Sequence, residues 1–183
     1  MSRTPKSGEA FDAFADDLLE ERSVRPLVIV GASKIDELLL ELLRAHLLPK
    51  IAKARDQDEL LEGDTPLATF SARIKACRRL GLIDDTLYRA LEQLRVLRNL
   101  STHSITFNHA ESPVREHLGE LRRKVGGRHS YRLTKKRYFD DAALRESEEL
   151  QCLLLTVCVL LEAIREKISA TPGHTSAMRI AAT

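Results

Sequence analysis

Tryptophan is absent from this chain of 183 residues, and aromatic residues make up only 4% of it. The eight Gly and six Pro fall mostly near the ends of the chain and in expected turns. Leu, Ala, Arg and Glu are abundant, and all four are good helix formers. This composition argues against a β-rich protein and favours an all-α fold.

Cysteine is also scarce. The chain has three cysteines, which are Cys77, Cys152 and Cys158. Their odd number, their apolar neighbours and the lack of a C-x-x-C pair are typical of reduced, buried thiols in a cytosolic protein. Three histidines, His103, His109 and His117, lack the spacing of a helical zinc site. We therefore predict no metal and no cofactor.

The chain lacks an apolar run long enough to cross a membrane. Its most apolar stretch, LQCLLLTVCVLLEAI at 150–164, has roughly a dozen apolar residues, against the ~20 that a bilayer requires. The first 23 residues have no apolar core behind a basic start, so they do not predict a secretory signal. We expect a cytoplasmic protein that does not act at a membrane.

The clearest local signals lie between residues 64 and 104 and predict two helices joined by a tight turn. Thr65 suits an N-cap, and Pro66 suits the first position of a helix. Gly81 suits the end of that helix, and Asp84 suits the N-cap of the next. The sequence therefore predicts an αα-hairpin at the centre of the fold.

Apolar stripes elsewhere predict further helices, including a long one from Pro26 and a last one from about Asp140 to Ser169. The fold class is therefore all-α, a single-domain bundle of about six helices. We expect the bundle to cover residues 10–170, with a flexible N-terminus at 1–9 and a disordered tail at 171–183. The expected buried residues are Leu38, Leu42, Phe70, Ile74, Leu91, Leu94, Leu154 and Leu161.

The second hairpin helix ends with three residues that suit phosphate chemistry. Arg98 carries a permanent charge on a planar fork, Asn99 is a neutral donor and acceptor, and His103 can transfer a proton near neutral pH. These three residues are the candidate catalytic residues. The alternative, which we favour for Arg98, is a structural ion pair with Asp36 or Glu37 on the long helix.

Positive charge is concentrated between residues 122 and 137, where eight Lys and Arg occur without an acidic residue. Such a segment can grip nucleic acid through phosphate contacts. It can equally dock on acidic residues of the same chain. The candidate nucleic-acid-binding residues are Arg128, Arg132, Lys135, Lys136 and Arg137.

Several blocks in order resemble the mannitol operon repressor family of small bacterial helical proteins, over roughly residues 10–167. The blocks are PLVIVGASKIDELLLELLRAHLL, GDTPLATFSARIKACRRLGLI, LRVLRNLSTHS, ITFNHAESPVREHL and YFDDAALRESEELQCLLLTVCVLLEAI. The resemblance implies a helical regulator of transcription. It does not locate an element that reads DNA.

A looser resemblance is to the HEPN superfamily of helical, RNA-associated domains. Its ribonuclease members carry an arginine, often followed by a polar residue, and then a histidine at a helix end. Arg98, Asn99 and His103 match that pattern. This resemblance implies a metal-independent endoribonuclease or an RNA-binding domain.

We therefore interpret the chain as a transcription regulator that acts mainly through protein contacts, without catalytic activity. A helix-turn-helix is disfavoured, because both hairpin helices look too long and too buried for a reading head. The HEPN-like ribonuclease or RNA-binding domain is the alternative. The long helix from Pro26 and the last helix have broad apolar faces, which predict a homodimer.

Overall fold

The computed structural model describes residues 7–47, 58–103, 107, 110 and 112–170. These residues form seven helices and no strand, which confirms the all-α fold. The helices are α1 (Ser7–Glu20), α2 (Val24–His46), α3 (Phe70–Arg79), α4 (Asp85–His103), α5 (Val114–Val125), α6 (His129–Phe139) and α7 (Glu146–Ala170). Of the predicted end segments, 1–9 and 171–183, residues 1–6 and 171–183 lie outside the described residues, and residues 7–9 belong to α1.

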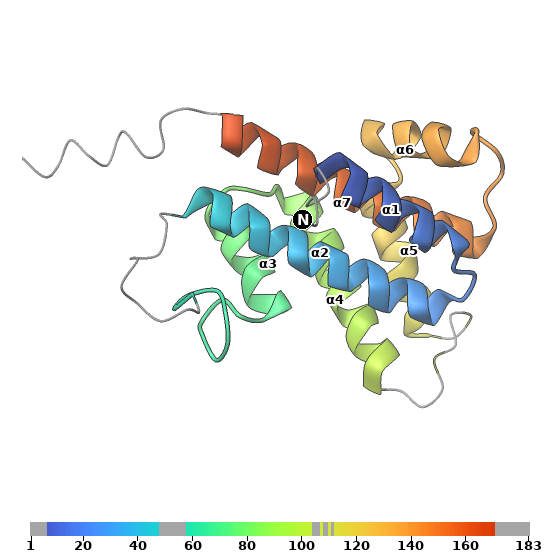
Figure 1. Ribbon diagram of the computed structural model, residues 1–183. Helices are drawn as coiled ribbons and strands as arrows, with labels where there is room; N and C mark the ends of the chain where they lie inside the picture. The colour runs from blue at the N-terminus through green and yellow to red at the C-terminus, as the bar shows by residue number, and fades with distance from the viewer. Residues whose placement is uncertain (1–6, 48–57, 104–106, 108–109, 111, 171–183) are drawn as a thin grey trace, which may run out of the picture.

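Helices α2 and α7 pack along each other and form the centre of the bundle (Figure 1). The α3–α4 hairpin packs against α2, and α5 contacts both α4 and α7. Helix α6 packs against α7, and α1 contacts both α2 and α7. All eight residues expected in the core are buried, at Leu38, Leu42, Phe70, Ile74, Leu91, Leu94, Leu154 and Leu161.

The contact between α2 and α7 is close because Gly31 has no side chain. A Cβ built on Gly31 would lie 2.7 Å from Cδ1 of Leu154, which is fully buried. A distance this short cannot be occupied without movement of the leucine. Glycine at this position therefore allows the two central helices to approach each other.

The hairpin turn follows its sequence signals. Gly81 has φ 72°, in the left-handed region, and the N–H of Leu82 donates to the carbonyl of Cys77 at 2.9 Å. The carboxylate of Asp84 accepts from the N–H of Leu87 at 2.6 Å, as an N-cap does. The predicted αα-hairpin is confirmed, with Gly81 and Asp84 in their expected roles.

The predicted start of the first hairpin helix is wrong. The helix begins at Phe70, and its N-cap is Thr69, whose hydroxyl accepts from the N–H of Ala72 at 3.2 Å. Residues 65–68 form a turn, and the N–H of Leu67 donates to the carbonyl of Leu60 at 2.9 Å. This contact with the preceding segment draws the chain out of helical geometry before Thr69.

The basic segment contains a helix, α6, that the sequence analysis did not identify. The last helix correspondingly begins at Glu146, and not at about Asp140. Asp140 and Asp141 have φ values of 48° and 56°, so the backbone leaves helical geometry at the end of α6. Two consecutive residues in the left-handed region separate α6 from α7.

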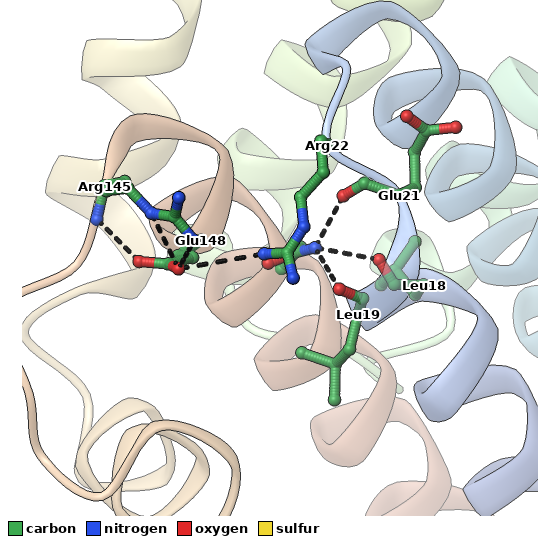
Figure 2. A network of polar contacts seen from close by, with 7 residues as sticks. Leu18, Leu19, Glu21, Arg22, Arg145 and Glu148 are labelled. Carbon is green, nitrogen blue, oxygen red and sulfur yellow. Dashed lines mark hydrogen bonds and ion pairs between the residues drawn. The ribbon is translucent and has the colours of Figure 1, made fainter.

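Helix α1 is fastened to α7 by one buried glutamine. The side-chain amide of Gln151 donates to the carbonyls of Leu18, Leu19 and Glu21 at 3.0, 3.1 and 2.8 Å. Figure 2 shows these carbonyls turned toward the same point. The last carbonyls of a helix have no partner within the helix, so Gln151 supplies the missing donor.

A charged cluster lies beside this cap. Arg22, just after α1, and Arg145, just before α7, both pair with the carboxylate of Glu148 (Figure 2). The backbone N–H of Arg145 also donates to Glu148, at 2.9 Å. Together with Gln151, Glu148 ties the end of α1 to the start of α7.

Candidate functional sites

The three candidate catalytic residues lie at the C-terminal end of α4. The guanidinium of Arg98 lies 5.7 Å from the centre of the Phe70 ring, and its side chain is half-buried. Asn99 and His103 are exposed. Within the described part of the chain, no hydrogen bond or ion pair joins the side chains of Arg98, Asn99 and His103. Arg98 thus packs over the α3 helix.

The expected ion pair between Arg98 and Asp36 or Glu37 is wrong. Asp36 pairs instead with Arg73 at 2.8 Å, and Glu37 pairs with Lys34 at 2.7 Å. Arg98 reaches neither carboxylate because it is directed to Phe70.

The arginine that does pair with Asp36, Arg73, is buried. Its side chain is 11% exposed and also donates to the carbonyls of Leu61 and Leu67, each at 3.1 Å. A signal for this position was available, since residue 73 follows Phe70 by three and therefore shares its helix face. Arg73 joins α2, α3 and the segment between them.

Part of the basic segment is neutralised by acidic residues of the same chain. Arg128 donates to both carboxylate oxygens of Asp84, at 2.8 and 2.9 Å. Arg137 donates to Asp12 of α1 at 3.0 Å. These two candidate nucleic-acid-binding residues therefore dock α6 onto α4 and α1.

The outward face of α6 remains open. His129, Arg132, Leu133 and Lys136 follow one another at helical spacing and are exposed. Leu133 has the highest exposure, 54%, of the exposed large hydrophobic residues in the described part of the chain. We call these four residues the α6 face. It combines positive charge with an apolar centre.

A polar groove of about 710 Å³ lies between α5, α6 and the start of α7. It is lined by Gly119, Arg122, Arg123, Gly126, Gly127, Tyr131, Lys135, Leu144 and Glu149. A smaller, more apolar cavity of about 180 Å³ adjoins it and shares Gly119, Arg122 and Glu149. Lys135, a candidate nucleic-acid-binding residue, thus faces this groove, while Lys136 lies on the α6 face.

The three thiols are buried and remain protonated. Burial raises the pKa of Cys77 and of Cys158 to about 12, and that of Cys152 to about 11. Burial likewise raises the pKa of Tyr131 to about 12, and its hydroxyl bonds to Cys152. A thiol must lose its proton to act as a nucleophile, so these cysteines are packing residues.

Two structural absences hold for the residues described above. No helix there is long and apolar enough to cross a membrane. Among the same residues, no three His, Cys, Asp or Glu side chains gather where a metal ion would fit.

Two solved bacterial structures have this helical arrangement. One is a possible transcriptional regulator, YggD, from Shigella flexneri, with a TM-score of 0.61 and 15% identity over 84% of this chain and 98% of that chain. The other is MtlR from Escherichia coli, in complex with HPr. This chain shares its fold with MtlR.

The likeness to MtlR has a TM-score of 0.52 and 22% identity, over 87% of this chain and 99% of that chain. It therefore spans nearly the whole bundle of both proteins. No family model and no curated protein sequence matches this chain. The shared feature is the fold, and the resemblance to the mannitol operon repressor family holds at that level.

Proposed function

We propose that this chain is a bacterial, cytoplasmic transcription regulator of the mannitol operon repressor type, which works by binding a partner protein. The observation that carries the proposal is the fold shared with MtlR, whose structure was solved as a complex with HPr. The partner proposed for this chain is accordingly HPr or a protein like it.

The α6 face is the proposed docking surface. Its exposed leucine lies between Arg132 and Lys136, and an exposed leucine among charged residues is the arrangement of an interface centre with a polar rim. Phosphate contacts to nucleic acid need the cations but not the leucine. Leu133 therefore favours a protein partner with an apolar centre and acidic residues around it.

Titration calorimetry with purified HPr tests this function. We expect the wild-type chain to bind and the Leu133→Asp variant to lose roughly tenfold or more in affinity, because a charge replaces the apolar centre. Leu80→Asp is the matched control, since Leu80 is also exposed, at 42%, but lies at the end of α3. The control should bind HPr as the wild type does.

Two results would contradict the proposal in different ways. A wild-type chain that gives no binding heat with HPr removes the proposed partner. If Leu133→Asp and Leu80→Asp weaken binding equally, or if neither weakens it, the α6 face is not the docking surface.

The second candidate function is the HEPN-like, metal-independent ribonuclease. Asn99 and His103 support it, because they lie four residues apart on α4 and are both exposed. In this candidate, His103 transfers the proton and Arg98 neutralises the phosphate charge. The test is whether the purified chain cleaves single-stranded RNA. Cleavage that His103→Ala abolishes with the fold intact would favour the ribonuclease over the regulator.

A further inference from the structure

The polar groove between α5 and α7 has an excess of positive charge. Arg122, Arg123 and Lys135 line it, against one carboxylate, Glu149. Arg122 is paired with Glu149 at 2.8 Å, and Arg123 is paired with Glu120 outside the groove. Both arginine side chains are largely exposed and can turn toward a ligand without leaving a buried charge behind.

Lys135 differs from the other two cations that line the groove, Arg122 and Arg123, which are both paired with a carboxylate. Its side chain is half-buried, yet within the described residues it has no hydrogen bond and no ion pair. Its ammonium group lines the groove without a counter-ion in that part of the chain, so an anion that enters the groove can pair with it directly. Lys136, the next residue, is exposed on the α6 face and does not line the groove.

The groove continues into the apolar cavity beside it. Gly119 lies on the border of both, and a Cβ placed on Gly119 would meet no atom within 4 Å. Leu118, Leu150 and Leu153 line the apolar side. A ligand with a charged end and an organic end could therefore lie across Gly119 with each end in a matching environment.

We propose that this composite groove binds a small phosphorylated molecule. Arg122, Arg123 and Lys135 hold the phosphate, and the organic part lies past Gly119 against the leucines. A phosphate monoester carries up to two charges and three free oxygens, which suits two planar guanidinium groups and one ammonium. The total cavity space, about 710 and 180 Å³, is of the size that small-molecule sites have.

The site is separate from the α6 face, so this proposal goes beyond partner binding and does not depend on it. Glu149 competes with the phosphate for Arg122, because the two have the same charge. Neutralising this carboxylate should therefore strengthen phosphate binding. The expectation distinguishes a phosphate site from an ion-pair cluster that only stabilises the fold.

Titration calorimetry at low salt with inorganic phosphate and phenyl phosphate tests the site. We expect both to bind the wild-type chain, and phenyl phosphate to bind more tightly because it has an apolar part. Lys135→Gln should weaken both by roughly tenfold, as loss of a charge-assisted hydrogen bond does. Lys136→Gln, its matched control, should change affinity less than twofold, and Glu149→Gln should tighten binding.

Gly119→Leu tests the apolar half without disturbing the fold. A Cβ at residue 119 would meet no atom within 4 Å, and leucine is a better helix former than glycine, so the thermal midpoint should not fall. It should nevertheless remove the preference for phenyl phosphate over inorganic phosphate. An unchanged preference would show that the organic part does not lie past Gly119.

Several results would overturn the site. One is no binding heat for either phosphate at millimolar concentration. Another is an equal loss of affinity in Lys135→Gln and Lys136→Gln, which would indicate only general surface charge. A third uses a ten-nucleotide single-stranded RNA: if it binds more tightly than phenyl phosphate and both lysine variants weaken it equally, the basic segment is an open nucleic-acid surface.

Discussion

Arg73 holds the segment before α3 against α2 through three partners. They are the Asp36 carboxylate and the carbonyls of Leu61 and Leu67. Removing the guanidinium would leave Asp36, 18% exposed, without its counter-charge, and both carbonyls without a donor. We expect Arg73→Met to lower the free energy of unfolding by about 3 kcal/mol, measured by urea denaturation.

Arg78→Met is the control for Arg73→Met. Arg78 also pairs with an aspartate, Asp85 at 2.7 Å, but both side chains are much more exposed than those of Arg73 and Asp36, at 39% and 68%. Solvent-exposed pairs contribute little, so this variant should unfold at nearly the wild-type urea concentration. Equal losses in the two variants would mean that the burial of Arg73 is not what makes its ion pair important.

Glu148 predicts a pH dependence. The side-chain hydrogen bond from Arg145 is the largest cause that lowers its pKa from 4.5 to about 2, followed by the backbone N–H of Arg145. A lowered carboxyl pKa stabilises the folded state above the unfolded pKa of 4.5, and this contribution disappears as pH falls toward 2. The stability advantage of wild type over Glu148→Gln should therefore be constant near pH 7 and shrink below pH 4.5.

Urea denaturation between pH 7 and pH 3 measures this difference. Arg145→Gln should reduce the pH dependence only in part, because it removes the side-chain hydrogen bond that lowers the pKa of Glu148 most but keeps the backbone N–H of residue 145. Wild-type and Glu148→Gln curves that run parallel across the whole range would contradict the assignment.

Replacing either of two helical glycines by alanine should change thermal stability, but in opposite directions. Gly31→Ala places a methyl group 2.7 Å from Leu154 in the packed core, at a cost of ~1–3 kcal/mol that outweighs the ~1 kcal/mol gain in helix propensity. Gly119→Ala meets nothing and keeps that gain. By thermal denaturation, Gly31→Ala should melt below wild type and Gly119→Ala above it. A stabilised Gly31→Ala would mean that α2 and α7 can move apart freely.

A helix end can be predicted from the sequence when it depends only on neighbouring residues. Gly81 and Asp84 were assigned correctly because a left-handed turn and an N-cap depend on neighbouring residues only. The start at Thr65 was wrong because Thr65 and Thr69 are equally good caps. The choice between them is made by the Leu67 bond to Leu60, a contact between segments that no local pattern reveals.

Helix α6 was not predicted, because the many charges of this segment were interpreted as a nucleic-acid-binding surface and not as a helix. Lys, Arg and Leu are good helix formers, but the segment has few apolar residues to mark a buried face. The chain stabilises this basic helix with acids from elsewhere, Asp84 through Arg128 at its start and Asp12 through Arg137 near its end. Which acids lie opposite can be known only from the tertiary structure.

The sequence identifies candidate site residues, but it does not show which of them lie together in the fold. Arg98, Asn99 and His103 do lie at one helix end, yet Arg98 packs over Phe70. Lys135 and Lys136 are neighbours in the sequence, but Lys135 lines the polar groove whereas Lys136 is exposed on the α6 face. Adjacent helix residues point about 100° apart, so a basic run in sequence divides between surfaces once it is helical.

In the whole molecule, the positive charge of the basic segment is divided between internal ion pairs and exposed surfaces. The segment 122–137 has eight cations, but ion pairs with Glu149, Glu120, Asp84 and Asp12 engage four of them. Of the other four, Arg132 and Lys136 lie on the α6 face and Lys135 lines the polar groove. A partner protein and a small ligand could therefore contact neighbouring sides of one helix, which would allow the ligand to influence partner binding.

The last prediction concerns self-association. The broad apolar faces of α2 and α7 predict a homodimer from the sequence. The apolar stretch of α7 is buried within one chain, from Leu150 to Cys158, so it cannot form an interface unless the bundle opens. In α2, Val30 remains 45% exposed in the first third of the helix. We therefore expect a homodimer that uses the outer face of α2.

Sedimentation equilibrium at micromolar concentration should give about twice the 20.6 kDa chain mass for wild type. Val30→Asp should shift the equilibrium to monomer, because it places a charge in the proposed interface without touching the core. Leu60→Asp is the control, since Leu60 is exposed to a similar degree, 44%, on the segment before α3. A wild-type chain that sediments as a monomer would contradict the dimer, and a dimer insensitive to Val30→Asp would move its interface away from α2.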